Sequence, residues 1–301
     1  MRIILMYSET DAYSLVAQGI KVLSSDLNGT LVLQQTMSDL VRIHQDDASY
    51  QLAAGILKLR QEGKASISDV LSKVAQLTRG VTLRQAIAYT TNHMQYTNGF
   101  AEFAAALAAS DVKLIINTTG YTVTACAIQE QIGKDIIHGY IANHLRFGVK
   151  GDENETLRED ELETKVRKYF TDPHSREDSS YDRIQATGAI DFAIPDEARK
   201  LRLLGAYLSS YLPEVYPHEV AHMGDTRGDG EAIVGVAAQG GVGILFNYDE
   251  TLYRYITAAI QEQPVPGKIY FMTPKSQAAD LREVPPALAR DFVPYRNKST
   301  L

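Results

Sequence analysis

Residues 20–31 read Ile-Lys-Val-Leu-Ser-Ser-Asp-Leu-Asn-Gly-Thr-Leu, and they decide the fold. The first half is an apolar run with the character of a β-strand, and Asn28-Gly29 supplies the turn that lets the backbone leave it. Asp26 therefore lies at the carboxyl end of a strand, which is where ligands bind in an open α/β sheet. A carboxylate held there can ligate a hard cation or attack an electrophile, and the alternative is a plain turn.

Two later apolar runs also end in polar side chains. Residues 113–120 read Lys-Leu-Ile-Ile-Asn-Thr-Thr-Gly and end in hydroxyls suited to holding an anionic oxygen. Residues 221–229 read Ala-His-Met-Gly-Asp-Thr-Arg-Gly-Asp and end in two carboxylates, Asp225 and Asp229. Lys200 lies between the two runs, in the second turn of a helix that we expect to begin at Pro195. The order of these residues favours a chemical role more than any one of them does alone.

Asp, Thr, Lys and paired Asp in this order resemble the motifs of the haloacid dehalogenase (HAD) superfamily of phosphohydrolases, over about residues 18–260. The resemblance is greatest to the phosphoserine-phosphatase branch, through Thr118-Thr119-Gly120-Tyr121-Thr122 and Ile141-Ala142-Asn143-His144-Leu145. It implies an α/β fold class: a Rossmann-like parallel sheet flanked by helices, the HAD-like core, with an inserted helical cap domain.

The predicted cap domain is residues 36–98, where apolar side chains recur at three and four positions, as in Leu52, Ile56 and Leu59. The alternative is that these helices only pack on the sheet. Residues 1–35 and 99–301 form the predicted core. Within it, residues 1–19 are expected to form a strand and a short helix ahead of the first motif. Within the core we expect helices at 99–109 and 123–132, a strand at 112–117, and the last sheet strand at 243–247. Residues 150–182 are dense in charge and are predicted to be a solvated helix face or a mobile insertion.

Composition excludes several classes of partner. The 301 residues suffice for one large or two unequal domains. A net charge of −7 and a pI near 5.5 argue against a nucleic-acid or anionic-membrane partner. No apolar run reaches the roughly 18 residues of a membrane span, and the first seven residues are too short for a signal-peptide core. We therefore expect a soluble cytoplasmic protein, whose oligomeric state stays open and whose one cysteine, Cys126, is a buried structural thiol.

The resemblance assigns chemistry to each motif. Asp26 is implied as the nucleophile that forms an aspartyl-phosphate, and Mg²⁺ as the cofactor that neutralises phosphoryl oxygens. The implied metal ligands are Asp26, the backbone carbonyl of Asn28 and Asp225, with Asp229 beside the metal as ligand or neighbour. Thr118, Thr119 and Lys200 are implied as donors to the phosphoryl oxygens of a small phosphorylated substrate. Taken singly, Thr118 also fits a strand-end cap and Lys200 a surface helix residue. Asp225 and Asp229 also fit a turn and a helix cap.

One position departs from the phosphatase pattern: Asn28 stands where the second aspartate, the general acid and base, is expected. Asparagine can neither donate nor accept that proton. Four accounts fit: an introduced substitution, a substrate with a good leaving group, replacement by another residue such as His44 or Asp46, or a different reaction. Phosphonate and carbon–halogen hydrolases of the superfamily also lack this aspartate, and a phosphonate hydrolase would need a Schiff-base lysine such as Lys58, Lys64 or Lys73. A catalytically weak, ligand-binding relative is a further alternative.

The substrate itself is not identified by the sequence. The aromatic and acidic residues with which phosphoserine phosphatases hold the serine amino and carboxyl groups are not evident, so phosphoserine is not the predicted substrate. Arg42, Arg79 and Arg84 are candidates for binding an anionic substrate group, although each also fits the surface. Gly228 replaces an asparagine common in the last motif, which keeps the turn but loses a side-chain hydrogen bond.

Overall fold

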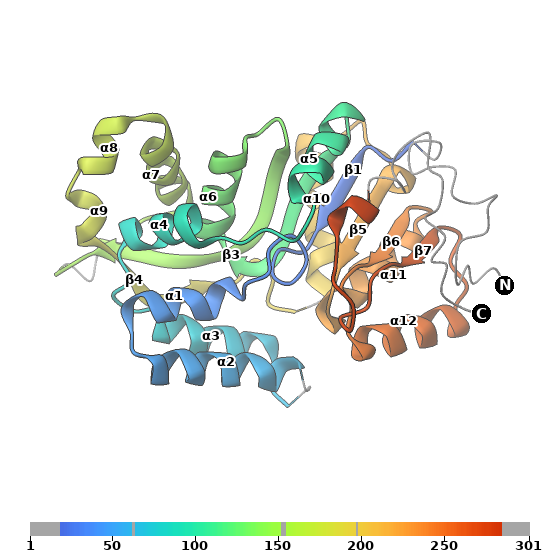
Figure 1. The fold of residues 1–301 in the computed structure, drawn as a ribbon, viewed down its shortest axis with the longest axis horizontal. Coiled ribbons are helices and arrows are strands. Elements are labelled where there is room, and N and C mark those ends of the chain that lie inside the picture. The colour runs from blue at the N-terminus through green and yellow to red at the C-terminus, as the bar shows by residue number, and fades with distance from the viewer. Residues whose placement is uncertain (1–18, 62–63, 152–154, 197, 285–301) are drawn as a thin grey trace.

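A computed structural model describes residues 19–61, 64–151, 155–196 and 198–284. The described chain is built on a seven-stranded sheet with the order β4-β3-β2-β1-β5-β6-β7 (Figure 1). Neighbouring strands are parallel except β3 and β4. The strands are β1 (Val22–Ser25), β2 (Lys113–Tyr121), β3 (Ile137–Val149), β4 (Ile184–Asp191), β5 (Val220–Gly224), β6 (Val242–Leu245) and β7 (Lys268–Phe271). The predicted α/β class with a mostly parallel, Rossmann-like sheet is confirmed.

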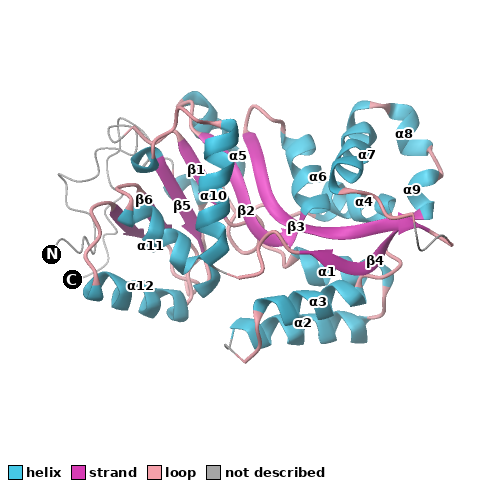
Figure 2. Ribbon diagram, turned by 180° about the vertical axis from the view of Figure 1, so that it is seen from behind, coloured by secondary structure: helices cyan, strands magenta, loops and turns pink. Residues whose placement is uncertain are grey.

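Helices cover both faces of the sheet, as Figure 2 shows. Adjacent residues of β1 face opposite ways, because side chains alternate along a strand. Leu23 packs in one apolar cluster with Phe103 of α5, whereas Val22 packs in another with Leu204 of α10 and Val236 of α11. The covering helices are α5 (Phe100–Ala109), α6 (Thr122–Ile132), α10 (Ala198–Tyr211), α11 (Gly230–Ala238) and α12 (Glu250–Glu262). A strand buried on both faces explains the continuous apolar run before Asp26.

Four helices between β1 and α5 confirm the helical pattern of residues 36–98: α1 (Thr36–His44), α2 (Asp47–Gln61), α3 (Ile67–Leu77) and α4 (Leu83–His93). Ser66 caps α3 by accepting a hydrogen bond from the Asp69 N–H, and Thr82 begins α4 with a capping box. Their apolar faces share one cluster with Tyr121 of β2, Phe147 of β3 and further residues of α6, β3 and β4. The division into cap and core domains stays a prediction.

The two connections to this helical block run side by side. The Leu33 N–H donates to the Gln95 carbonyl and the Thr97 N–H donates to the Leu31 carbonyl. Val32 and Tyr96 form an antiparallel bridge between the two connections. The block therefore leaves and rejoins the sheet at one place, close to Asp26.

The described part of residues 150–182 has the expected solvated helix face but is also packed into the protein. They carry α7 (Glu159–Thr171), α8 (Pro173–Glu177) and most of α9 (Ser180–Arg183). In Figures 1 and 2 these helices lie on the opposite side of the β3–β4 hairpin from α1–α3. Leu162, Val166 and Tyr181 are buried in the same cluster as the helical block. The charged residues Glu159, Asp160 and Glu161 are exposed on the outer face of α7, whose inner face packs into the protein.

Two further expectations from the sequence are not met by the described structure, and a third falls outside it. The strand at 243–247 is not the last, because β7 follows it; this four-residue edge strand has too short a pattern to be recognised in the sequence. Lys200 lies in the first turn of α10 rather than the second, since the helix begins at Ala198. The elements expected in residues 1–19 lie almost wholly outside the described residues. Within the described chain, no helix is both long and apolar enough to cross a membrane.

Candidate active site

Three carboxylates meet at the carboxyl ends of β1 and β5. Asp26 follows β1, Asp225 follows β5, and Asp229 ends a short 3₁₀ helix, Arg227–Asp229, one turn later. Ser25 and Met223 are paired in the parallel register of the two strands, so the residues after them emerge at the same level. One oxygen from each carboxylate lies within 4.8 Å of the others, and all three residues are buried. The structure thus brings together the three acidic residues predicted from separate motifs.

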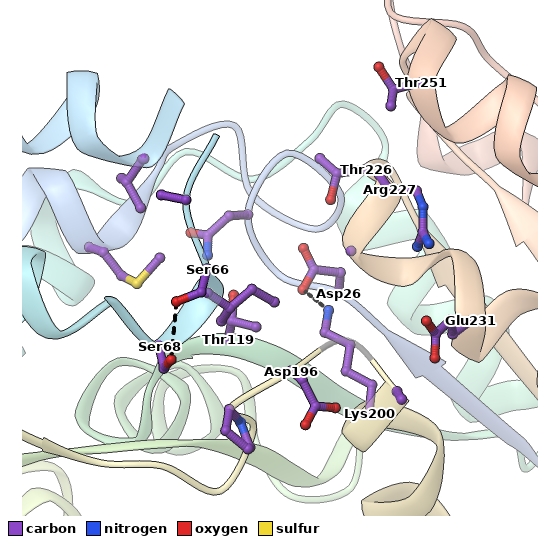
Figure 3. A pocket seen from close by; sticks show the side chains of 18 of the residues that line it. Asp26, Ser66, Ser68, Thr119, Asp196, Lys200, Thr226, Arg227, Glu231 and Thr251 are labelled. Carbon is purple, nitrogen blue, oxygen red and sulfur yellow. Dashed lines mark hydrogen bonds and ion pairs between the residues drawn. The ribbon is translucent and has the colours of Figure 1, made fainter. Parts of the chain in front are cut away.

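Lys200 joins this cluster from the first turn of α10. Its Nζ lies 2.8 Å from Asp26 Oδ1, a pair drawn in Figure 3. The same Nζ lies 2.6 Å from Asp229 Oδ1, and the Lys200 side chain is 2 % exposed. Asn117 of β2 donates a hydrogen bond to the Lys200 carbonyl at 3.2 Å, which holds the start of α10 against the sheet. Burial alone would lower the pKa of Lys200, but the carboxylates of Asp229 and Asp26 raise it above its usual range. The ammonium therefore stays charged and fixes the orientation of Asp26.

Asp229 also has a neighbour that the sequence did not suggest. His222 is fully buried on β5, with Nδ1 3.0 Å from Ser24 Oγ and Nε2 3.6 Å from Asp229 Oδ1. Burial raises the pKa of Asp229, yet the charge of Lys200 and the contact with His222 hold that pKa well below its usual range. The only sequence signal for His222 was a polar residue inside an apolar strand.

Asp225 lies deeper and is paired differently. Thr30 donates a hydrogen bond to its Oδ1 at 3.4 Å, and Lys275 Nζ lies 2.9 Å from its Oδ2. Burial raises the pKa of Asp225 to about 8, against the opposing charge of Lys275. Lys275 follows β7 in a segment without periodicity, so nothing in the sequence connected it with this site.

The turn after Asp26 is shaped by close packing against Asp225. Gly29 has a φ of +78°, and a Cβ at this position would collide with Asp225 Oδ2. The Asn28 side chain accepts a hydrogen bond from the Thr36 N–H at 2.9 Å, which ties the turn to the start of α1. Asn28 therefore has a structural role that an aspartate would perform equally well.

The two predicted hydroxyl residues are placed differently. Thr119 lines a cavity beside Asp26, with its side chain seen in Figure 3. Thr118 is fully buried, and its Oγ1 accepts a hydrogen bond from the Gly120 N–H at 3.1 Å. Thr119 is thus the better placed of the two to meet a ligand in the cavity.

This cavity has a volume of about 770 Å³ and lies between the strand ends and helices α1–α3. Of the predicted site residues, Asp26, Asn28, Thr119 and Lys200 line it, while Asp225 and Asp229 lie behind them. Arg227, which the sequence reasoning missed, also lines it and stacks 3.5 Å over the Tyr255 ring.

The other candidate cations do not line the cavity. Arg84 donates to Asp182 at 2.8 Å and to the carbonyls of Asp178 and Arg176, so it holds α4 against the segment before β4. Arg42 pairs with Asp47. Neither these residues nor Arg79, His44, Asp46, Lys58, Lys64 and Lys73 are among the residues that line the cavity.

The donor set fits a hard divalent cation. Three carboxylate oxygens converge, and Oδ2 of the fully buried Asp225 is paired with a partly exposed lysine, Lys275. Mg²⁺ favours oxygen ligands and keeps several waters, so a site with few carboxylates beside a cavity suits it. Asp26 and Asp225 are the residues that would hold the ion, with Asp229 beside it, and Lys200 and Lys275 balance the charge of the three carboxylates.

Known proteins were compared with this chain by sequence and by structure. No protein-family model matches, and no curated protein sequence matches. Two solved structures of phosphoserine phosphatase are similar to this chain: one is described as a phospho-aspartyl intermediate analogue and the other as a substrate-bound complex. Each is 16 % identical to this chain, with a TM-score of 0.60 over 89 % of this chain's residues. The matches cover 99 % of the first structure's chain and 98 % of the second's. A HAD family hydrolase from Salmonella enterica serovar Typhi is 13 % identical with a TM-score of 0.54, over 82 % of this chain and 66 % of its own.

The chain therefore has the α/β fold of the HAD family hydrolases. Within that class its arrangement is similar to that of the phosphoserine phosphatases, as the sequence resemblance implied. At these identities the likeness establishes the fold, and the chemistry has to be argued from this chain's own site.

Proposed function

We propose that this protein is a Mg²⁺-dependent phosphatase that hydrolyses a small phosphorylated metabolite through an aspartyl-phosphate intermediate on Asp26. The observation that carries the proposal is the pairing of Asp26 with the buried Lys200 at 2.8 Å, beside two further carboxylates and a cavity. A carboxylate held in one orientation at a strand end is suited to in-line attack on phosphorus. The cytoplasmic location stays a prediction.

Each residue has a distinct task in this scheme. Asp26 attacks the phosphoryl group while Lys200 holds its other oxygen and offsets charge on the phosphoryl oxygens. Thr119 is placed to donate to those oxygens, and the buried Asp229 keeps Lys200 in position. A bound Mg²⁺ would neutralise the phosphoryl oxygens, which otherwise repel the nucleophile. Water then cleaves the aspartyl-phosphate.

Asn28 limits this reaction. It cannot protonate the leaving alkoxide or deprotonate the attacking water, and these steps are typically worth about 10²- to 10⁴-fold in rate. The substrate is therefore expected to have a leaving group that departs without a proton, or turnover is expected to be slow. His44 and Asp46 do not line the cavity, so replacement of the acid by either residue has no support.

Three alternatives remain distinct from this proposal. Phosphonate hydrolysis would need a Schiff-base lysine, and among the cavity-lining residues that the structure describes the only lysine is Lys200, which is held by two carboxylates. Carbon–halogen hydrolysis would use Asp26 but no metal, so it would continue in EDTA. A ligand-binding relative would bind phosphorylated ligands with Mg²⁺ and release no phosphate.

The test is phosphate release from a panel of phosphorylated metabolites, with Mg²⁺ or EDTA. We expect release that depends on Mg²⁺ and that falls at least about 10³-fold in Asp26→Asn, because the nucleophile is lost. Asp111→Asn is the matched control: it makes the same chemical change at an exposed residue with a φ of 53°, which asparagine tolerates. Equal activity in Asp26→Asn and the control would refute the proposal.

A further inference from the structure

The walls of the cavity differ in charge. The side formed by the start of α1 and by α2 and α3 contributes four apolar residues and three uncharged polar ones: Met37, Leu57, Ala65 and Ile67, with Gln35, Ser66 and Ser68. No charged side chain from this wall is among the described residues that line the cavity. The opposite walls carry Asp26, Asp196, Glu231 and Asp249 as acidic groups and Lys200 and Arg227 as the basic ones.

The two basic groups are engaged on the sheet side. Lys200 is held between two carboxylates, and Arg227 stacks on Tyr255 of α12. Figure 3 shows Arg227 on one side of Asp26 and Ser66 and Ser68 on the other. In an in-line displacement the leaving oxygen lies opposite the nucleophile. A group that leaves from phosphorus attacked by Asp26 therefore points away from the sheet, toward the uncharged wall.

From this arrangement, and resting on the proposed phosphatase function, we propose that the substrate is a phosphate ester whose alcohol part carries no negative charge. Its body would be partly apolar, with a hydroxyl group that could hydrogen-bond to Ser68, since the Ser66 hydroxyl is engaged by Asp69. A second carboxylate on the alcohol part would be buried against an uncharged wall that offers no cation among the described residues lining the cavity. An unpaired buried charge of this kind is strongly disfavoured.

The volume of the cavity agrees with this class of ligand. About 770 Å³ is within the range of pockets that enclose a small organic molecule, and it exceeds what a phosphoryl group alone requires. The apolar wall can therefore contribute binding through burial of the alcohol part.

The proposal can be tested with two esters that differ in one group. Glycerol 3-phosphate carries a hydroxymethyl group where 3-phosphoglycerate carries a carboxylate. In calorimetry with Mg²⁺, we expect the protein to bind glycerol 3-phosphate at least about tenfold more tightly than 3-phosphoglycerate. Phosphate release measured in parallel should likewise be faster from glycerol 3-phosphate. Equal or tighter binding of 3-phosphoglycerate, or binding of neither ester, would overturn the inference.

A designed cation supplies the complementary test. Ser68→Arg places a positive charge on the uncharged wall and is expected to bring the affinity for 3-phosphoglycerate up to that for glycerol 3-phosphate. Ser72→Arg is the control, because it makes the same change one turn later on α3 at a residue that does not line the cavity. An unchanged preference in Ser68→Arg would contradict the assigned wall.

Binding and release separate the two proposals. If the protein binds glycerol 3-phosphate more tightly but releases no phosphate from either ester or from acetyl phosphate, the phosphatase function is rejected. The inference that the ligand has an uncharged alcohol part is then kept. Release that favours the carboxylate ester would keep the phosphatase function and reject the ligand class.

Discussion

Replacing Asn28 by aspartate tests the weakest point of the proposed chemistry. The side chain already accepts a hydrogen bond from the Thr36 N–H at 2.9 Å, and a carboxylate oxygen accepts the same bond. The substitution therefore exchanges only the amide NH₂ for an oxygen that can carry a proton. Because Asn28 lines the cavity beside Asp26, the new carboxyl group would face the reacting ester.

The expected gain follows from what a general acid contributes. Proton donation to the leaving alkoxide is worth about 10²- to 10⁴-fold, or roughly 3 to 5 kcal/mol of the activation barrier. Burial beside Asp26 and Asp225 favours the protonated form of a new carboxyl group, as it does for Asp225, whose pKa is raised to about 8. In that neutral form the acid adds no repulsion toward the phosphate. We therefore expect kcat to rise at least about a hundredfold, with little change in KM.

The assay is Mg²⁺-dependent phosphate release from alkyl phosphate esters, whose leaving groups need a proton. Asn28→Ala is the matched control, since it removes the acceptor for the Thr36 N–H and supplies no acid. It should show no gain in kcat and lose about 1 to 3 kcal/mol of stability through the unsatisfied buried N–H. If Asn28→Asp folds and binds Mg²⁺ but turns over no faster than the unmodified chain, the assignment of this position to acid–base chemistry is wrong.

Three further predictions concern the carboxylate cluster. Lys200→Met should lower the free energy of unfolding by about 3 to 5 kcal/mol, because it leaves buried carboxylates uncompensated. Lys275→Met should lower the free energy of unfolding by less than about 1 kcal/mol, because this lysine is partly exposed and Asp225 can take up a proton. Equal losses of unfolding free energy for the two variants in urea denaturation would contradict this difference. Gly29→Ala should abolish Mg²⁺ binding in calorimetry by displacing Asp225, whereas Gly19→Ala, with a similar φ of +70° and open space around it, should leave binding intact. Because Asp225 must lose its proton to bind the ion, Mg²⁺ affinity should fall about tenfold per pH unit below about 8, and a flat profile between pH 6 and 8 would refute this.

The sequence predicted the parts of the site that are local. Asp26 and Asp225 each follow an apolar run, and a strand pattern followed by a turn is readable within ten residues. Their convergence then follows from the parallel pairing of β1 and β5, which end at the same edge of the sheet. The helices of residues 36–98 were readable for the same reason, because their apolar spacing is regular.

Contacts between distant segments could not be predicted in this way. Lys275 reaches Asp225 only because β7 adds to the sheet edge beside β6, and neither the short strand nor the segment after it has a distinctive pattern. The acidic run at 152–163 correctly suggested a solvated helix face, but its charge density hid the apolar inner face on which Leu162 is buried. Arg84 was weighed as an anion ligand, but its partners Asp182 and Asp178 lie 98 and 94 residues away in sequence.

The apolar cluster that α1–α4 share with α6 and β3 has a consequence for the timing of catalysis. A lid that opens on each turnover needs an interface that separates at little cost, and such opening often limits kcat. Here the wall of the cavity is fastened to the sheet through fully buried residues such as Tyr121 and Phe147, and separating them would expose apolar surface at about 25 cal/mol per Å². Substrate and product should therefore exchange through a permanent opening without gating, and the helical block and the sheet should melt in one cooperative transition.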